Sequence, residues 1–302
     1  MVVTVFYFML NMSIASCFVI IMLLLVRQIR PLPRRVVYPL WSLGFFRLIM
    51  PFTIPTSWSL FNFTGGLVKK VVGIDPVSTM NMIGAVERYA PLEYKTHILQ
   101  QVFTISSVIW LIVAGALLLT AMVLHRLSSK ELKQAIHIRD NLYHTDMVGS
   151  PLLVGLVRPR IILPTSLDPD SAEASMIVAH ETIHQSRMDN LWRILGICVA
   201  CLHWFNPLVW VMLKAFFVDM ERSCDEAVIR RYSTVERKAY AATLLRFAED
   251  KQLLTSTSFG RSGVKVRIVN VLNYRKLTLL GTLTSGLFLA ILAIVLISNP
   301  PA

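Results

Sequence analysis

The chain has 302 residues, 55% of them hydrophobic, and a mean hydropathy of +0.59. Soluble domains are roughly 45–50% apolar, so this composition argues against an ordinary soluble protein and favours a membrane protein. Only 16% of the residues are charged, yet the formal net charge is +12. Such an excess is typical of the cytoplasmic loops of membrane proteins. No run of Lys and Arg alternates with aromatic residues, so direct nucleic-acid binding is not predicted.

Four stretches of the chain are long and apolar enough to cross a bilayer, which takes about 20 residues in a helix. The first has no charge and no small-residue cleavage site after it, so it is predicted to be a retained anchor and not a signal peptide. The second contains Arg47, Pro51 and Pro55 and is expected to be kinked or partly re-entrant. The four predicted spans are Val2–Val26, Val36–Phe63, Val102–Leu124 and Leu277–Ser298.

The basic residues predict how these spans are oriented. Cytoplasmic loops hold the positive excess, and no basic residue precedes the first span, so the N-terminus is placed outside. With four crossings the C-terminus is outside as well, and residues 127–276, with most of the 30 Lys and Arg, lie in the cytoplasm. The sequence thus predicts a multi-pass protein of the cell membrane. The loop between the first two spans holds Arg27, Arg30, Arg34 and Arg35.

The predicted cytoplasmic segment, residues 127–276, is large enough for one domain. It opens with a polar, helix-like stretch near Ser128–Ala135. Two short apolar strands are predicted within Pro151–Pro164, because Gly and Pro residues punctuate this stretch. Residues Val157–Leu163 could form an edge strand that aligns an extended substrate by strand addition, or equally a core strand.

A helix is predicted over Ala172–Met188, because Asp170 or Ser171 can cap its start. The stretch Leu191–Met220 is again apolar, but His203–Pro207 interrupts it and leaves pieces too short to cross a bilayer comfortably. These pieces are predicted to be helices that pack on the membrane face or on the other spans, and not a fifth crossing.

The predicted helix contains the sequence His-Glu-Thr-Ile-His, residues 180–184. Histidines four residues apart lie on one face of a helix, where both imidazoles can bind one Zn²⁺. Glu181 lies beside them and is suited to take a proton from a water that the metal activates. This pentapeptide also occurs by chance, but apolar neighbours give the helix a buried face, which is unusual for solvated histidines. We therefore predict His180 and His184 as zinc ligands and Glu181 as the catalytic residue.

A catalytic zinc site takes three protein ligands and leaves one position open. An acidic cluster at the end of the long apolar stretch supplies Glu221 as the predicted third ligand. Asp225 lies four residues later on the same helix face. It is predicted to accept a hydrogen bond from the far nitrogen of a ligand histidine and so to fix its tautomer.

Three further residues are weaker candidates for this site. Asp189 follows His184 by five residues and is expected to be an outer hydrogen-bonding partner or a structural group that pairs with Arg187. His203 and Asp219 are alternative third ligands.

The order of the motifs resembles the beta-lactam sensor and signal-transducer family of integral-membrane zinc metallopeptidases, the antirepressor type. The resemblance covers essentially the whole chain, and several motifs in one order are more specific than His-Glu-x-x-His alone. It implies a gluzincin-like peptidase with His180, His184 and Glu221 on zinc and Glu181 as general base, the assignments already reached from the residues. The motifs begin at Pro151 (P-x-x-x-G-x-x-x-P-x-I-x-L-P), His180 (H-E-x-x-H-x-x-R-x-D), Trp204 (W-F-N-P-x-x-W) and Glu221 (E-x-x-C-D).

We therefore predict a mainly α membrane protein with about four transmembrane helices and a cytoplasmic α+β zinc metallopeptidase domain. Residues 1–126 would hold three transmembrane helices and their loops. Residues 127–276 would form the peptidase domain with its membrane-associated helices. Residues 277–302 would form the last transmembrane helix and a short external tail.

The resemblance also implies self-cleavage in the cytoplasmic loop before the last span, and loss of a DNA-binding repressor. In that loop Ser258–Phe259 is the candidate self-cleavage bond, although an ordinary flexible Ser/Thr linker fits these residues equally well. Receptors of this family carry an external penicillin-binding domain after the last span. This chain ends at Ala302 and has no Ser-x-x-Lys motif in the predicted external parts, so beta-lactam recognition is not inferred and the inducing signal stays open.

The leading hypothesis is a membrane zinc endopeptidase that transduces a signal by cleaving itself, a cytosolic protein such as a transcriptional repressor, or both. Its cofactor would be Zn²⁺, and its partners the lipid bilayer and the cytosolic substrate; a homodimer is compatible with the sequence. One alternative is a membrane quality-control or maturation metallopeptidase, which shares the site. Another is a non-catalytic signalling scaffold, which Glu181 argues against because a structural zinc site needs no general base.

Overall fold

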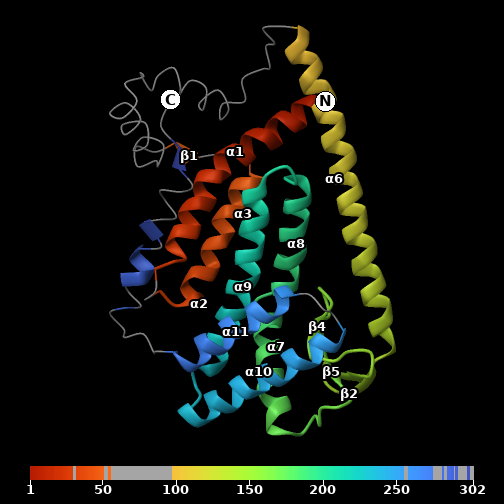
Figure 1. Cartoon of the computed structure of the whole chain (residues 1–302), viewed down its shortest axis with the longest axis vertical. Coiled ribbons are helices and arrows are strands. Elements are labelled where there is room, and N and C mark those ends of the chain that lie inside the picture. The colour runs from red at the N-terminus through yellow and green to blue at the C-terminus, as the bar shows by residue number, and fades with distance from the viewer. Residues whose placement is uncertain are drawn as a thin grey trace.

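The computed structural model describes residues 1–29, 32–50, 54–55, 97–254, 258–274, 281, 284–288, 290–291 and 298–299. Within them the chain is mostly helical and contains one small four-stranded sheet. Figure 1 shows a helical bundle with the sheet and several further helices gathered at its lower end. The described part agrees with the predicted combination of long helices and a small α+β unit. The predicted span Leu277–Ser298 and the second half of Val36–Phe63 lie largely outside the described residues.

The first part of the bundle consists of a long helix and a shorter one that packs beside it (Figure 1). The shorter helix ends at Ile49, where Met50 takes an extended backbone conformation. Pro51 disfavours the helical conformation in the residue before it, so the helix ends where an interruption of the second span was predicted. The elements are α1 (Val2–Val26), α2 (Arg34–Val37), the 3-10 turn η1 (Tyr38–Leu40) and α3 (Trp41–Ile49).

Two helices of the described part are long and apolar enough to cross a membrane: α1 and residues His97–Ser128 of α6 (His97–Glu131). The bundle buries about half of α1, whereas α6 exposes apolar side chains such as Ile105 and Ile112 along its length. Long exposed apolar faces of this kind are typical of contact with lipid. The structure thus supports the first and third predicted spans. The other two spans, the orientation and the domain boundaries stay predictions.

A helical hairpin completes the bundle: α8 (Asp189–Leu202) and α9 (Pro207–Ile229) stand beside α1 and α3 (Figure 1). Its tip lies beside the middle of α1, because the Asn206 amide donates to the Oγ of Ser13 at 2.8 Å. Asn206 also caps α9, and its side-chain oxygen accepts from the Leu208 amide. The predicted pair of packed helices is therefore present. Its contacts with α1 and α3 bury Ile20, Leu23, Trp41, Phe45, Val209, Met212 and Phe216.

The sheet has the strand order β2-β3-β5-β4, so β4 lies at an edge. The predicted strand pair is present, and β4 runs antiparallel to β5. Because β5 lies between β3 and β4, the residues Val157–Leu163 contribute a core strand, and the edge-strand alternative for them was wrong. The strands are β2 (Ile136–Arg139), β3 (Leu142–Thr145), β4 (Leu152–Val154) and β5 (Arg160–Pro164), with a separate short parallel pair of β1 (Ile54–Pro55) and β6 (Ser298–Asn299).

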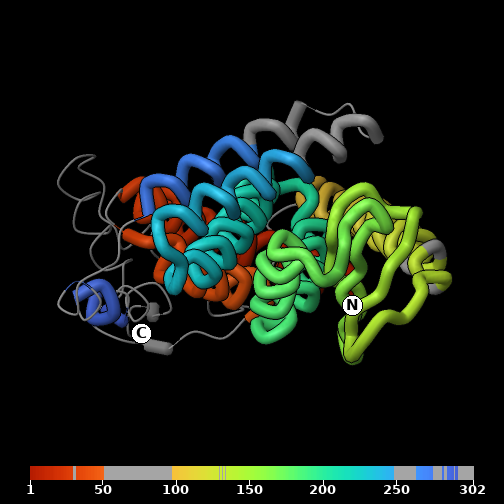
Figure 2. The backbone as a smooth tube through the Cα atoms, turned by 90° about the horizontal axis from the view of Figure 1, so that it is seen from below, coloured from red at the N-terminus to blue at the C-terminus, as the bar shows by residue number. Residues whose placement is uncertain are grey.

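The helix with the His-Glu-x-x-His sequence, α7 (Ala172–Ser186), packs between the sheet and the later helices. Its start is capped as predicted, since the Ser171 hydroxyl accepts from the Ala174 amide at 3.1 Å. Figure 2 shows α10 (Thr234–Leu254) and α11 (Ser258–Leu272) side by side, and both contribute to the surroundings of α7 and α9. This arrangement brings side chains from four helices to one buried face of α7.

Candidate metal centre

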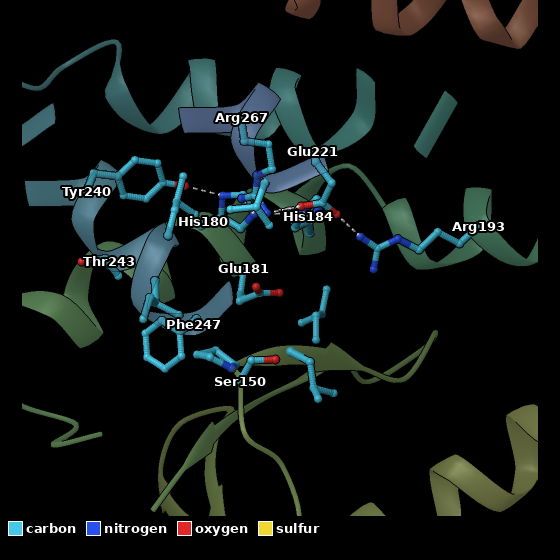
Figure 3. Close-up of a pocket in the computed structure, with 16 residues that line it drawn as sticks. Ser150, His180, Glu181, His184, Arg193, Glu221, Tyr240, Thr243, Phe247 and Arg267 are labelled. Atoms are coloured by element: carbon cyan, nitrogen blue, oxygen red, sulfur yellow. Dashed lines mark hydrogen bonds and ion pairs between the residues drawn. The ribbon is translucent and has the colours of Figure 1, made fainter. Parts of the chain in front are cut away.

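The two histidines of α7 face the same point in the interior. His180 and His184 are 6% and 1% exposed, and their Nε2 atoms are 3.1 Å apart (Figure 3). This closeness follows from their spacing of four residues, which is about one helical turn. Two buried imidazoles that present the same ring nitrogen to one another are the arrangement expected of ligands to a shared metal ion.

The far nitrogen of each imidazole is held by another side chain. The Nδ1 atom of His184 is 2.6 Å from a carboxylate oxygen of Asp189, and that of His180 is 2.8 Å from the hydroxyl of Tyr240. The Tyr240 hydroxyl in turn donates to Asp225 at 2.8 Å. Burial and the Asp225 charge raise the pKa of Tyr240 well above its ordinary value, so its one proton stays in place.

These bonds determine the tautomer of both ligands. Because the Tyr240 proton points to Asp225, the Tyr240 oxygen accepts from the Nδ1–H group of His180. Asp189 can only accept from His184, so His184 also carries its proton on Nδ1. When the two imidazoles are neutral, both Nε2 atoms present a lone pair to the space between them, which is the state required to bind a metal ion.

Glu221 of α9 faces the two imidazoles. One of its oxygens is 3.6 Å from Nε2 of His180, and the other is 3.7 Å from Nε2 of His184. Ligand atoms about 2.1 Å from a tetrahedral zinc ion lie roughly 3.4 Å apart, so the three groups fit one ion. Burial raises the pKa of Glu221, but the Arg267 guanidinium and the two imidazoles outweigh it and hold the pKa well below its ordinary value. Glu221 is therefore a carboxylate.

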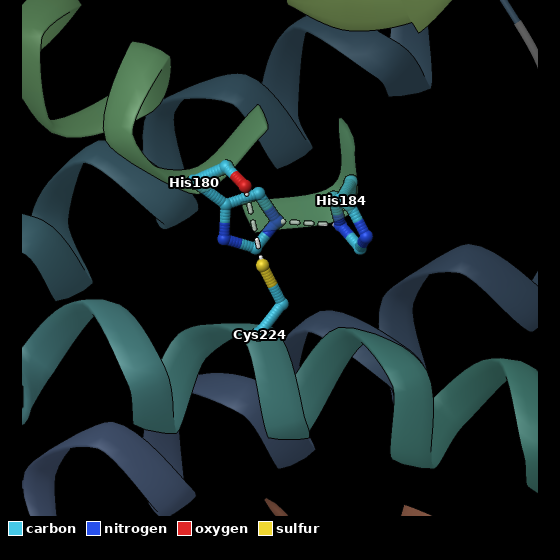
Figure 4. A group of neighbouring side chains, drawn as sticks. All are labelled: His180, His184 and Cys224. Atoms are coloured by element: carbon cyan, nitrogen blue, oxygen red, sulfur yellow. Dashed lines mark hydrogen bonds between the residues drawn. The ribbon is translucent and has the colours of Figure 1, made fainter. Parts of the chain in front are cut away.

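Cys224 is another group that could bind a metal beside the histidines. Its Sγ atom and one nitrogen from each of His180 and His184 lie within 4.8 Å of one another (Figure 4). However, the thiol is fully buried and donates to the main-chain oxygen of His180 at 3.2 Å. Glu221 lines the open cavity at the site and Cys224 does not. A catalytic site must keep one position accessible, so Glu221 suits the third position better.

Two arginines hold the acidic groups of the centre. Arg267 of α11 donates to both oxygens of Asp225 at 2.8 Å and lies 3.2 Å from Glu221. Arg193 of α8 donates to the other oxygen of Glu221 at 2.6 Å. Charge-assisted pairs of this kind fix the orientation of both carboxylates, and they connect α8, α9 and α11 around the histidines.

A cavity of about 180 Å³ opens on this centre, and Glu181 lines it. Figure 3 shows the Glu181 carboxylate between the histidines and the chain around Ser150. Residues Ser150–Leu153, which include the start of the edge strand β4, form one wall. Another part of the lining comes from α10 and α11, through Tyr240, Thr243, Phe247, Val264 and Arg267.

The remaining predicted residues are distributed as follows. Asp189 lies at the site, but Arg187 does not pair with it and donates instead to Ser223 at 3.0 Å. His203 and Asp219 lie away from the centre: His203 contacts the main-chain oxygen of Leu48, and Asp219 accepts from Arg27 and Trp41.

Asp225 reaches His180 mainly through Tyr240, which the sequence interpretation did not foresee. The Ser258–Phe259 bond lies in the first turn of α11, and residues 255–257 are outside the described residues.

Sequence reasoning missed three residues of the centre: Tyr240, Arg193 and Arg267. They come from three helices and have no fixed spacing to the motif, so no local pattern indicated them. The signal that could have found Arg267 is the need for a buried acidic cluster on α9 to have cationic partners.

Two histidines one turn apart, a glutamate from a second helix and a further glutamate in an open cavity match the pattern of ligands and base that is typical of zinc metallopeptidases. Residues 7–271 match the family described as BlaR1 peptidase M56. The chain belongs to this family, the beta-lactam sensor and signal-transducer metallopeptidases.

Several named proteins are similar to this chain. Regulatory protein BlaR1 of Bacillus licheniformis is 33% identical over 172 residues, which are 54% of this chain and 29% of that protein. Methicillin resistance mecR1 protein of Staphylococcus aureus is 26% identical over 105 residues, 34% of this chain and 18% of that protein. Regulatory protein BlaR1 of Staphylococcus aureus is 23% identical over 300 residues, 87% of this chain and 50% of that protein. The chain therefore spans half or less of the length of these relatives.

Proposed function

We propose that this protein is a membrane zinc endopeptidase that transduces a signal by cleaving itself, a cytosolic protein such as a transcriptional repressor, or both, in an antibiotic-response type of pathway. The observation that carries the proposal is the meeting of His180, His184 and Glu221 at mutual distances of 3.1–3.7 Å, with Glu181 in the adjoining cavity. The names of the relatives, which refer to regulation and methicillin resistance, support the signalling part.

The proposed zinc ligands are His180, His184 and Glu221. When bound, zinc would activate a water molecule and polarise the scissile carbonyl group. Asp189 and Tyr240 keep the two imidazoles turned toward the metal position. Arg193 and Arg267 fix the two oxygens of Glu221, so the ligand set is held before a substrate arrives.

Glu181 is the proposed general base. It follows His180 directly on α7 and lines the cavity, where it can accept a proton from the attacking water and return it to the leaving amine. Hydrolysis consumes one water and one peptide bond, and the proton that Glu181 accepts ends on the new amino group. No covalent bond to the protein is required.

The edge strand β4 is the proposed track for the substrate. The main-chain oxygen of Leu153 accepts from the Asn190 side chain, so the polar groups of Leu153 face away from β5. In an antiparallel pair the N–H and C=O of one residue point to the same side, so the Leu153 N–H also faces outward. An extended peptide beside Ser150–Leu153 would gain a main-chain hydrogen bond next to the metal centre.

The position of Ser258–Phe259 is compatible with self-cleavage. In the sequence, this bond lies between Phe247 of α10 and Val264 of α11, and both of these residues line the cavity. The bond would have to leave the helical conformation of the first turn of α11, because peptidases bind their substrates in extended form. A segment that frays at a helix end can do this at low cost.

The test of the enzymatic proposal is Glu181→Gln in the full chain, with zinc content and self-cleavage measured on the same preparation. We expect the variant to keep zinc and to lose cleavage by at least about 100-fold, since it retains the ligands and lacks the base. Glu173→Gln is the matched control, because Glu173 lies on the same helix but pairs with Arg246. Cleavage that is unchanged in Glu181→Gln would show that this site is not the peptidase centre.

A second experiment addresses the substrate. Cytosolic and membrane proteomes are compared in cells that produce the wild type or Glu181→Gln. Loss of one DNA-binding regulator in the wild type alone supports the signalling proposal. Accumulation of many fragments of membrane proteins would instead support a quality-control peptidase.

A further inference from the structure

A second cavity, of about 420 Å³, lies away from the metal centre. One wall is the corner where α2 meets α3, with Arg35 and Tyr38. The others are Arg187 at the end of α7, Trp192 of α8 and Phe216 of α9. Its Ser223 is two residues from Glu221, and therefore faces the opposite side of α9 from the metal centre.

The cavity has two cationic groups, Arg35 and Arg187, that form no ion pair with a carboxylate of the described residues. Within the described residues, Arg187 donates to the Ser223 hydroxyl and lies 5.9 Å from the centre of the Tyr38 ring, and the Arg35 guanidinium forms no ion pair. The neighbouring Arg27 differs, because it pairs with Asp219 at 2.8 Å. Two guanidinium groups beside a partly buried aromatic wall form a site for an anion, and phosphate oxygens suit their planar donors well.

The position of the cavity indicates where the anion comes from. The membrane-type helix α1 ends at Val26, nine residues before Arg35. Trp and Tyr side chains are enriched at the membrane–water interface, and here Trp192 and Tyr38 line the cavity together with the two arginines. An anionic phospholipid offers both a phosphate for the guanidinium groups and apolar chain segments for the aromatic wall.

The cavity wall is also directly bonded to the metal centre. The Tyr38 hydroxyl donates to one oxygen of Asp189 at 2.6 Å. The other oxygen of Asp189 is 2.6 Å from Nδ1 of His184. The Tyr38 ring is stacked on Phe216, with ring centres 5.6 Å apart. A ligand that holds this ring therefore also holds the residue that orients His184.

We propose that this cavity binds the phosphate headgroup of an anionic phospholipid, and that the bound lipid holds Tyr38, Asp189 and His184 in the arrangement that binds metal. The first part, the lipid site, stands independently of catalysis. The second part rests on the proposed function, because it assumes that His184 is a zinc ligand.

The lipid site is tested by calorimetric titration of the purified full chain in a neutral detergent. The probes are short-chain phosphatidylglycerol, short-chain phosphatidylcholine and inorganic phosphate. We expect phosphatidylglycerol to bind, and Arg35→Gln and Arg187→Gln each to weaken it by about tenfold or more, since each removes a charge-assisted hydrogen bond. Arg230→Gln is the control, because Arg230 is exposed at the end of α9 and does not line the cavity.

Three outcomes would overturn the lipid site. Equal binding of phosphatidylcholine would remove the requirement for an anion, and equal binding of inorganic phosphate would make this a free-anion site and not a lipid site. Unchanged phosphatidylglycerol binding in Arg35→Gln and Arg187→Gln would place the lipid elsewhere. Arg35→Gln keeps the proposal testable if Arg187→Gln fails to fold, because the Arg35 guanidinium has no ion pair within the described residues to lose.

The link to the metal centre is tested with Tyr38→Phe, which keeps the ring and removes the hydroxyl bond to Asp189. Zinc affinity is measured by chelator competition with phosphatidylglycerol or phosphatidylcholine present. We expect phosphatidylglycerol to raise the zinc affinity of the wild type severalfold, and the variant to bind the lipid without this increase. An equal increase in the variant would refute the link. A wild type that binds the lipid but no zinc would contradict the proposed function and leave the lipid site intact.

Discussion

The two halves of α9 bury opposite kinds of side chains. The first half contributes Val209, Met212 and Phe216 to the apolar core of the bundle, all at most 2% exposed. The second half buries Asp219, Asp225 and Glu226, and it directs Glu221 to the metal centre. One helix thus serves as a packing element at one end and as a source of buried acidic groups at the other.

The acidic half can be buried because other elements supply a donor to each carboxylate. Asp219 accepts from Arg27, Asp225 from Arg267, and Glu226 from the main-chain N–H groups of Arg34 and Arg35. A buried charge without a partner is strongly unfavourable, so this half depends on α1, α2 and α11 being in place. The comparison teaches that apolar packing alone stabilises the first half of α9. The second half also packs Met220, Val228 and Ile229, but it needs in addition a matched donor for each buried carboxylate.

The largest effect is expected when one partner of a buried pair is removed from the acidic half. Asp225→Ala removes the carboxylate that accepts two hydrogen bonds from the Arg267 guanidinium, and it should lower the free energy of unfolding by roughly 3–5 kcal/mol. Chemical unfolding in detergent measures this. Asp170→Ala removes a surface pair with Arg139, more than half exposed on both sides, and should change the stability by only about 0–1 kcal/mol. Equal changes in the free energy of unfolding for Asp225→Ala and Asp170→Ala would show that the buried ion pair contributes no more to stability than the surface pair.

A somewhat smaller effect of different origin is expected in the apolar half. Met212 is fully buried among α1, α3 and α9, so Met212→Ala should cost about 2–4 kcal/mol through lost contacts and a cavity. Zinc affinity should stay close to that of the wild type, because Met212 is more than two turns from Glu221. Parallel unfolding and zinc-binding measurements check this. A large loss of zinc affinity would show that the two halves are not independent.

The smallest effect on stability should accompany a clear effect on metal binding. Tyr240→Phe removes the hydroxyl between His180 and Asp225 and should reduce zinc affinity by about 10–100-fold, as expected for an outer partner of a metal ligand. Tyr232→Phe is the matched control, since Tyr232 packs near Tyr240 but makes no hydrogen bond to either histidine. Chelator competition compares the two variants, and equal affinities would show that Tyr240 does not orient His180.

The local parts of the site could be predicted from the sequence because helical spacing determines them. A separation of four residues places His180 beside His184 and Glu221 beside Asp225, whatever the rest of the chain does. The cap at Ser171, the break at Pro51 and the strand pair at β4 and β5 follow in the same way from local chemistry. The roles of these residues in metal binding and catalysis stay predictions until the variants are measured.

Other features depended on how distant segments pack. The strands β2 and β3 were missed, because each is only four residues long and contains a histidine, so neither forms a clear apolar run. The edge position of β4 was missed as well, because strand order is a property of the sheet and not of any one strand.

The sequence by itself determined the membrane-type composition, the two-histidine helix and the acidic helix that meets it. Only the tertiary structure decided that Tyr240 stands between His180 and Asp225, that Arg193 and Arg267 hold Glu221, and that Tyr38 reaches Asp189. The physical reason is the range of the interactions. Backbone periodicity acts over one or two turns, whereas these contacts join residues 15 to 151 positions apart and exist only once the helices have packed.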